Sequence, residues 1–258
     1  MTGPKSLRER LAEGRAALGV VLRGVDTAVA ELVGLVGFDF AWIDMEHSAM
    51  GFRDVEHLVL ALDNRGCVPV VRVRHNEPNA IGQALDLGAE VVVVPHVDTA
   101  ADAARAVAGA KYFPVGHRGF SSAGRSNRQG MDAITPEAMD GQNRRSMLMV
   151  QIESRAAVAG VDEIAAVDGV DILFLGLGDL CQDLGVPGRA DDPRCRRAAE
   201  AVSRAARATG RIAATVLGDP ADLDRWTGLG FRLFCCGVDV LLMRDALTDR
   251  LDAFRAER

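Results

Sequence analysis

The stretch Cys67–Val97, CVPVVRVRHNEPNAIGQALDLGAEVVVVPHV, decides the fold because it has the pattern of a strand, a helix and a second strand. Its two ends, Cys67–Arg74 and Val91–Val97, are short and rich in valine, as buried strands are. Between them, Asn79–Leu87 places apolar residues three and four positions apart, which is the spacing of one helix face. Two strands joined by a helix usually lie parallel in one sheet. We therefore expect a βαβ unit here.

The same alternation continues on both sides of this unit. Short β-branched runs predict further strands at Ala17–Arg23, Phe38–Glu46, Leu148–Glu153, Val170–Gly176, Arg211–Leu217 and Arg232–Gly237. Amphipathic stretches predict further helices at Thr27–Val36, Arg53–Asn64, Ala100–Ala108, Pro136–Arg145, Arg155–Val167, Asp192–Thr209, Asp219–Thr227 and from Val240 to the end. Eight strand–helix units in 258 residues match an α/β fold, the (β/α)8 or TIM barrel, as a single domain over residues 1–258. A doubly wound open sheet is the alternative, although it usually carries fewer strands at this length.

Composition and charge exclude several classes of protein. The chain is 48% hydrophobic and 26% charged, which is ordinary for a globular protein, and its formal net charge is −6. We expect no nucleic-acid partner, because neutralising phosphates requires a concentrated basic face. No apolar run is long enough for a signal peptide or a membrane span, so we expect no membrane partner either. Five cysteines without a CxxC pair argue against a disulfide framework or a zinc knuckle, and they favour a cytoplasmic protein.

Polar residues gather where the expected strands end, and the active site of such a barrel lies at the carboxyl ends of its strands. These residues are Asp44, Glu46, His47, Arg72, Gln151, Glu153 and Asp179, the last of which follows Gly178. Glu153 and Asp179 follow adjacent strands, so their carboxylates can converge at one end of the barrel. Two carboxylates with water molecules are a usual way to hold Mg²⁺ or Mn²⁺. The alternative is a pair of carboxylates that accept hydrogen bonds from the neighbouring backbone.

Five side chains allow two interpretations each. Arg72 lies within a valine-rich run, where a guanidinium needs an anion, either a core carboxylate or the carboxylate of a substrate. His47 belongs to the side-chain type that exchanges protons most readily near neutral pH, but a histidine packed in a loop is the more common case. Asp86 stands near the end of an expected helix, where a solvated carboxylate is ordinary. In the long loop after Lys111, Arg125 and Arg128 either meet an anionic acceptor or are simply solvated.

Six motifs together resemble those of one known family in order and spacing. They are IDMEHS (43–48), PVVRV (69–73), LDLGAEVVVVPHV (85–97), KYFPVGHRGFSS (111–122), VQIESRAAV (150–158) and GVDILFLGLGDLCQDLG (169–185). The chain resembles the HpcH/HpaI aldolase family in this way from about Leu18 to Val240. The resemblance implies a metal-dependent, class II pyruvate aldolase, similar to 4-hydroxy-2-oxoheptanedioate or 2-keto-3-deoxy sugar acid aldolases.

The resemblance also implies roles for individual residues. Glu153 and Asp179 correspond to the ligands of a divalent metal ion, which is Mg²⁺, Mn²⁺ or Co²⁺. Arg72 corresponds to the arginine that binds the keto acid and stabilises the enolate. His47, paired with Asp86, corresponds to the group that moves the proton.

The other residues at the strand ends have supporting roles in the resemblance. Asp44 and Glu46 look like the groups that hold metal-bound waters, and Gln151 lines the pocket. The backbone amides of Gly178 and Asp179 resemble a turn that binds the substrate carboxylate. The family's proline before this glycine is Leu177 here, so the geometry of the turn is open.

The resemblance extends to substrates and assembly. It implies a 2-oxo acid, pyruvate or oxaloacetate, together with an aldehyde or keto acceptor. It also implies a homo-oligomer, commonly a hexamer built as a trimer of dimers, in which the C-terminal helix (about 240–258) is exchanged between subunits. A biosynthetic condensing enzyme, similar to the citrate-synthase-like members or to macrophomate synthase, is the alternative, and a non-catalytic binding protein is the third.

The lysine content separates two kinds of aldolase. A class I enzyme needs a lysine on a barrel strand to form a Schiff base with the keto acid. The chain has only two lysines, Lys5 and Lys111, and neither lies in an expected strand. Enolate formation is therefore expected to depend on the metal ion.

Overall fold

Eight parallel strands form a closed barrel in the computed structural model, which describes residues 5–256. The strands follow one another around the barrel, and β8 pairs in parallel with β1. They are β1 (Ala17–Leu22), β2 (Phe40–Asp44), β3 (Val68–Arg72), β4 (Val91–Val94), β5 (Met147–Ile152), β6 (Ile172–Leu175), β7 (Ile212–Val216) and β8 (Phe231–Val238). The predicted α/β barrel is confirmed, and the open sheet is excluded.

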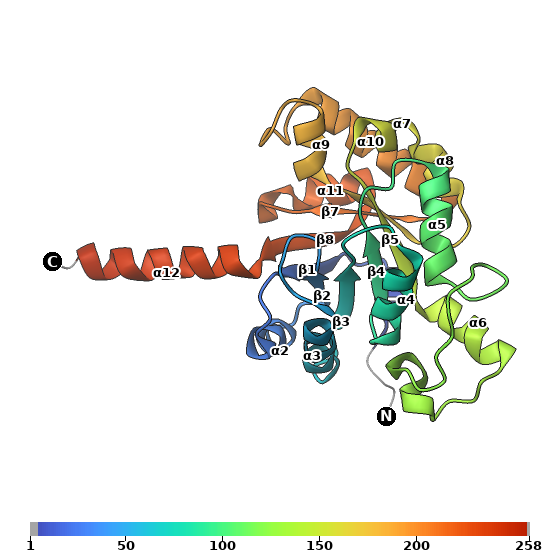
Figure 1. Cartoon of the computed structure of the whole chain (residues 1–258). Coiled ribbons are helices and arrows are strands. Elements are labelled where there is room, and N and C mark those ends of the chain that lie inside the picture. Colours follow the sequence, from blue (N-terminus) through green and yellow to red (C-terminus); the bar gives the residue numbers. More distant parts are fainter. Residues whose placement is uncertain (1–4, 257–258) are drawn as a thin grey trace.

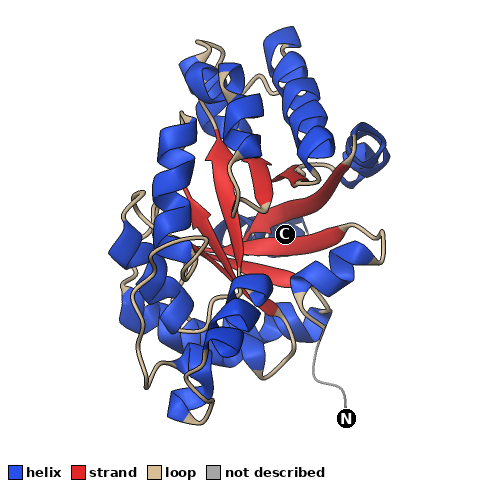
Figure 2. Cartoon of the chain, turned by 90° about the vertical axis from the view of Figure 1, so that its right-hand side faces the viewer, coloured by secondary structure: helices blue, strands red, loops and turns tan. Residues whose placement is uncertain are grey.

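Helices surround the strands, as Figure 2 shows with helices in blue and strands in red. They are α1 (Leu7–Ala12), α2 (Thr27–Val36), α3 (Phe52–Asp63), α4 (Pro78–Asp86), α5 (Ala100–Ala110), α6 (Pro136–Arg145), α7 (Arg155–Ala159), α8 (Val161–Ala166), α9 (Leu177–Asp183), α10 (Pro193–Thr209), α11 (Leu223–Leu229) and α12 (Asp239–Ala256), with 3-10 turns η1 (Arg125–Gly130) and η2 (Pro220–Asp222). The helix expected over 155–167 is divided into α7 and α8 at Gly160.

The unit β3–α4–β4 forms as its sequence predicts. Pro78 begins α4, where its missing N–H costs nothing, and the Glu77 side chain accepts a hydrogen bond from the Ala80 amide. The buried face of α4 carries Ile81 and Leu85, at the spacing that identified the helix. Burying each such aliphatic side chain stabilises the fold by about 1.5–3 kcal/mol.

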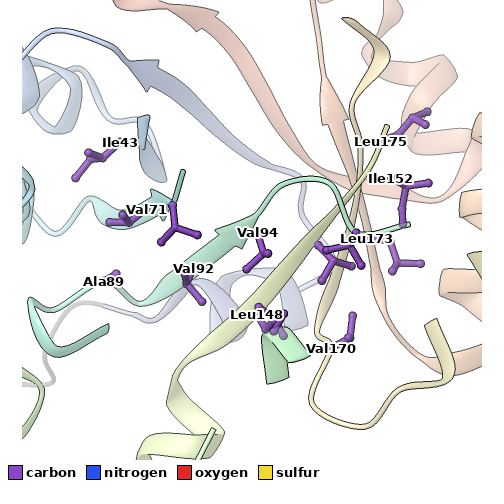
Figure 3. Packing of buried hydrophobic residues seen from close by; sticks show 14 of the residues in the cluster. Ile43, Val71, Ala89, Val92, Val94, Leu148, Ile152, Val170, Leu173 and Leu175 are labelled. Carbon is purple, nitrogen blue, oxygen red and sulfur yellow. The ribbon is translucent and has the colours of Figure 1, made fainter. Parts of the chain in front are cut away.

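Buried side chains form two layers, one inside the barrel and one outside it. Inside, residues two apart on a strand point to the same face, and Trp42 of β2 meets Phe174 of β6 with ring centroids 4.8 Å apart. Outside, side chains such as Ile43, Val71 and Leu173 pack between the strands and the helices, as Figure 3 shows. The alternation of β2 thus sends Trp42 inward and Ile43 outward, and the next residue, Asp44, ends the strand facing inward at the mouth of the barrel.

The last helix does not cover the barrel. Figure 1 shows α12, in red, extending away from the body of the molecule. Of its residues, only Asp239 is buried. None of the helices among residues 5–256 is long and apolar enough to cross a membrane.

Candidate active site

A buried ion pair joins the ends of β2 and β3. Asp44 and Arg72 stand opposite each other in the strand register. Arg72 donates from Nε to Asp44 Oδ1 (3.0 Å), and its Nη2 lies 2.8 Å from Oδ2, so the contact is bidentate. Arg72 also donates from Nη1 to Gln151 Oε1 (3.2 Å) on β5, and its guanidinium lies 5.4 Å from the centre of the Trp42 ring. Its position in space is therefore fixed from three sides.

The partner that the sequence left open for Arg72 is a core carboxylate. Asp44 is only 1% exposed. Burial by itself raises the pKa of this carboxyl, but the hydrogen bonds and charge of Arg72 outweigh burial and hold the pKa below its usual value. Asp44 Oδ1 also accepts from the backbone amides of Glu46 (3.1 Å) and His47 (3.2 Å), so it shapes the turn after β2.

Glu153, just after β5, is held by donors on two sides. Gln151 Nε2 donates to its Oε2, and the His96 amide donates to its Oε1 (2.8 Å). The His96 imidazole bridges two carboxylates, with Nδ1 3.2 Å from Glu153 Oε1 and Nε2 3.2 Å from Glu46 Oε1. His96 adopts a left-handed backbone conformation with φ of 53°, which is uncommon outside glycine.

The carboxylates at this end of the barrel share their positive partners, because Arg72 contacts both Asp44 and Glu46 and His96 contacts both Glu46 and Glu153. Glu153 is 3% exposed, and its pKa is raised, chiefly by burial and further by the charges of Glu46 and Asp179, against the opposing effect of His96. Glu46 Oε2 forms ion-pair contacts with Arg72 Nη1 (2.8 Å) and His47 Nε2 (3.8 Å), but this buried oxygen accepts no hydrogen bond among the described residues. A cation bound here would relieve both groups.

Asp179 and Gly178 lie in the first turn of α9, directly after β6, and both are exposed. The neighbouring Gly176 is needed for space, because a Cβ atom there would stand 2.9 Å from Glu153 Cβ and 3.0 Å from its Oε2. Leu177 takes the first helical position, where the family's proline would also fit. Among residues 5–256, no group of three or more His, Cys, Asp or Glu side chains is arranged to hold a metal ion.

The chain does not bring His47 and Asp86 together. His47 is exposed at the mouth, with Nε2 3.8 Å from Glu46 Oε2. Asp86 ends α4, which runs back along the barrel, so it lies near the start of β4 at the opposite end. There it pairs with the buried Arg118 at 2.5 Å. An interaction between His47 and Asp86 is therefore absent within the described single chain.

Two residues at the mouth escaped the sequence analysis as functional candidates. One is His96, whose only signal was its place at the end of the fourth strand. The other is Arg23, directly after β1, whose Nε lies 3.4 Å from Asp44 Oδ2. Its signal was its place at the end of the first expected strand. The sequence alone could not show that the two side chains turn towards the acidic residues.

Neither lysine lies at the carboxyl ends of the strands. Lys111 is buried and donates to the carbonyl oxygens of Asn143 (3.0 Å) and Ser146 (2.6 Å) and to Asp171 (3.2 Å), while exposed Lys5 pairs with Glu13. Both lysines lie outside the eight strands, as the sequence predicts.

A cavity of about 620 Å³ opens at the other end of the barrel and contains none of the candidate site residues. Arg125 and Arg128 line it, and each is paired with a carboxylate, Asp63 (2.6 Å) and Asp132 (2.5 Å) respectively. This arrangement favours the interpretation of a surface loop over that of an acceptor site for these two arginines.

Comparison with known proteins agrees with the fold and with the motifs. The model of the family described as HpcH/HpaI aldolase/citrate lyase matches residues 18–246. The chain is 34% identical over 251 residues to a 2-keto-3-deoxy-L-rhamnonate aldolase of Salmonella gallinarum, covering 96% of this chain and 92% of that protein. Among solved structures, it is similar to an HpcH/HpaI aldolase from Desulfitobacterium hafniense DCB-2, with a TM-score of 0.91, 28% identity and coverage of 97% and 96%. It is also similar to citrate synthase SbnG, with a TM-score of 0.86, 27% identity and coverage of 98% of both chains. The chain therefore belongs to the HpcH/HpaI aldolase/citrate lyase family.

Proposed function

We propose that this protein is a metal-dependent carbon–carbon lyase that cleaves or forms 4-hydroxy-2-oxo acids through the enolate of pyruvate or a related 2-oxo acid. The observation that carries the proposal is the combination, at the strand ends, of a fixed guanidinium with buried carboxylates that lack enough positive partners. Arg72 supplies the guanidinium, Glu153 is the buried carboxylate whose pKa is raised, and Glu46 Oε2 is a buried oxygen that accepts no hydrogen bond among the described residues. Enolate chemistry needs this combination, because negative charge develops on the keto oxygen when the bond breaks.

The donor set fits a hard divalent cation. Glu153 and Asp179 would hold the ion, which we expect to be Mg²⁺, Mn²⁺ or Co²⁺. Oxygen ligands suit such ions, and a site of two carboxylates leaves positions for water and substrate oxygens. The buried Glu46 Oε2, which accepts no hydrogen bond from the described residues, and the raised pKa of Glu153 support the presence of a cation between these groups. When bound, the ion polarises the keto group and stabilises negative charge on its oxygen.

The chain's own residues orient the substrate and move protons. The amides of Gly178 and Asp179 would hold the carboxylate of the 2-oxo acid. Arg72, held by Asp44, would stabilise the oxygen that becomes negative. In the cleavage direction, His47 would take the proton of the 4-hydroxyl, the C3–C4 bond would break to release the aldehyde, and C3 would take up a proton.

Two measurements test the proposal. The first is the appearance of solvent deuterium in the methyl group of pyruvate, which we expect with Mg²⁺ or Mn²⁺ and expect to vanish with EDTA. The second is Mn²⁺ binding, which we expect Glu153→Gln to abolish and the surface variant Glu163→Gln to leave unchanged. Exchange at the same rate without metal, or unaltered Mn²⁺ binding by Glu153→Gln, would refute the assignment.

A condensing enzyme of the same family is the second candidate, and the similarity to citrate synthase SbnG favours it. Such an enzyme would join an enolate to a keto acid and would not cleave simple 4-hydroxy-2-oxo acids. Incubating pyruvate or oxaloacetate with aldehydes and, separately, with a second keto acid distinguishes the two candidates.

We also propose that copies of this single-domain chain assemble by exchanging α12, in the hexameric arrangement expected from the resemblance. The apolar side chains along the projecting helix support this, because a helix that contacts its own barrel at one end only needs another surface to cover it. The five free thiols are compatible with the predicted cytoplasmic location.

A further inference from the structure

Arg23 places a second guanidinium at the mouth of the barrel, and its one ion-pair contact among the described residues is with Asp44. It follows β1 directly, and its Nε lies 3.4 Å from Asp44 Oδ2. That distance is an ion-pair contact only: the Arg23 side chain makes no hydrogen bond with any residue of the described chain. Asp44 already receives a bidentate contact from Arg72. The Arg23 side chain is 38% exposed, so its donors are available to a ligand.

The backbone that carries Arg23 is fixed by an acidic residue at the start of α12. The carboxylate of Asp239 accepts hydrogen bonds from the amides of Arg23 (3.1 Å) and Gly24 (2.9 Å). Asp239 is 8% exposed, so this contact is shielded from water. A buried anchor of this kind sets the starting point of the side chain and reduces the cost of ordering it around a ligand.

The closed barrel puts Arg23 across the mouth from the proposed metal ligands. In the strand order, β1 stands opposite β5, which Glu153 follows, and Arg72 of β3 lies between them. A 2-oxo acid held at Glu153 and Asp179 would therefore point its far end, which is the acceptor part of the molecule, towards β1. Arg23, which is a cation and directly follows β1, would meet this acceptor part.

We propose that Arg23 is a specificity-determining residue that binds a carboxylate on the acceptor part of the substrate. The inference rests on the proposed function and narrows its substrates to 4-hydroxy-2-oxo acids with a second carboxylate. In the condensation direction, that carboxylate comes from the aldehyde. A guanidinium matches a carboxylate through two parallel N–H···O contacts, which an uncharged aldehyde cannot accept. Arg72 cannot serve both ends, because Asp44 and Gln151 hold it in place and the proposed function assigns its remaining donors to the keto oxygen.

The test compares matched aldehydes with pyruvate as the donor: glyoxylate against acetaldehyde, and succinic semialdehyde against butanal. We expect the wild-type protein to prefer each carboxylated aldehyde by at least tenfold in kcat/KM. Arg23→Gln should lower kcat/KM for the carboxylated aldehydes by about 10–100-fold, the usual effect of losing a charged hydrogen bond, mainly through KM. For the neutral aldehydes the change should stay within about threefold. Arg23→Lys should keep part of the preference, and the remote surface variant Arg204→Gln should keep all of it.

Two outcomes would overturn the inference: a wild-type protein without the preference, or an Arg23→Gln variant that loses activity equally on both aldehydes of a pair. The second outcome would mean that Arg23 acts only by supporting Asp44. Deuterium exchange into pyruvate needs no aldehyde and therefore reports on the donor half alone. If the wild-type protein exchanges deuterium but does not discriminate, only the Arg23 inference fails, whereas absent exchange means that the proposed function itself fails. Circular dichroism of each variant shows whether the barrel is intact.

Discussion

The ion pair between Asp44 and Arg72 illustrates how single residues at the strand ends combine structure and chemistry. Both side chains are buried at the mouth, and Asp44 also orders the turn that carries His47. The sequence could predict that Arg72 needs an anion, because a buried guanidinium without one is costly. It could not predict which anion, since the partner comes from another strand and depends on the strand register.

We expect Asp44→Asn to reduce stability and activity together. Breaking a buried pair typically costs about 3–5 kcal/mol in unfolding free energy, and the lower end applies here because Glu46 stays 2.8 Å from Arg72 Nη1. The folded-state pKa of Asp44 is lowered, so its stabilising contribution is present above 3.8 and is lost as the pH falls through the lowered pKa. Urea denaturation of both proteins at pH 7 and at pH 3 measures the effect. A variant as stable as the wild type at pH 7 would contradict it.

Glu153 should give the opposite pH dependence in the metal-free protein. Its folded-state pKa is raised, so its favourable contribution is present below the ordinary value of 4.5 and is lost as the pH rises through the raised pKa. In EDTA, we expect the unfolding free energy of the wild type to fall from pH 4.5 upwards relative to Glu153→Gln, which cannot titrate. Denaturation curves at several pH values compare the two slopes, with Glu163→Gln as the control. Parallel curves for the wild type and Glu153→Gln would show that Glu153 does not titrate in this range.

At the scale of the elements, the sequence predicted the strand–helix alternation well and the ends of the elements less well. Valine-rich runs such as Val91–Val94 identify buried strands because a strand that is covered on both faces carries apolar side chains at every position. The short helix α9 was not predicted, since seven residues after a strand show too little periodicity. The relation between His47 and Asp86 could not be predicted either, because it depends on the direction in which α4 returns along the barrel.

The junction of β6 and α9 should be sensitive to a single methyl group. We expect Gly176→Ala to weaken Mn²⁺ binding by about 10–100-fold, as loss of the groups that position metal ligands does, because the new Cβ would push Glu153 aside. Isothermal titration with Mn²⁺ measures this. Gly228→Ala is the matched control, since a Cβ there meets nothing within 4 Å. Equal Mn²⁺ affinity in Gly176→Ala and the wild type would contradict the proposed position of the ion.

At the scale of the whole molecule, the barrel is closed, but the apolar side chains of its last helix are exposed to water. The other helices surround the strands, whereas α12 leaves the body after β8 (Figure 1). The amphipathic pattern predicts a helix at the C-terminus, and the family resemblance implies that subunits exchange it. The pattern alone could not show that the helix points outwards, because it looks the same whether the covering surface belongs to the same chain or to a second copy.

The apolar side chains of α12 make a specific prediction about assembly. Val240, Met243, Leu247, Leu251 and Phe254 recur at spacings of three and four, so they form one stripe, and each is about half exposed or more. A stripe of this length in contact with water is unfavourable, and we expect it to be buried against another copy of the chain.

We expect the double variant Leu247→Glu/Leu251→Glu to lower the molar mass measured by light scattering from that of an oligomer to that of a smaller species. Placing carboxylates in an apolar contact costs several kcal/mol per charge, more than most interfaces between subunits tolerate at single positions. The barrel itself should remain folded by circular dichroism, since neither residue contacts it. Thr248→Glu, which adds a charge beside the stripe, is the matched control and should leave the mass unchanged. A wild-type protein that is monomeric, or a double variant with the wild-type mass, would show that α12 does not hold the assembly together.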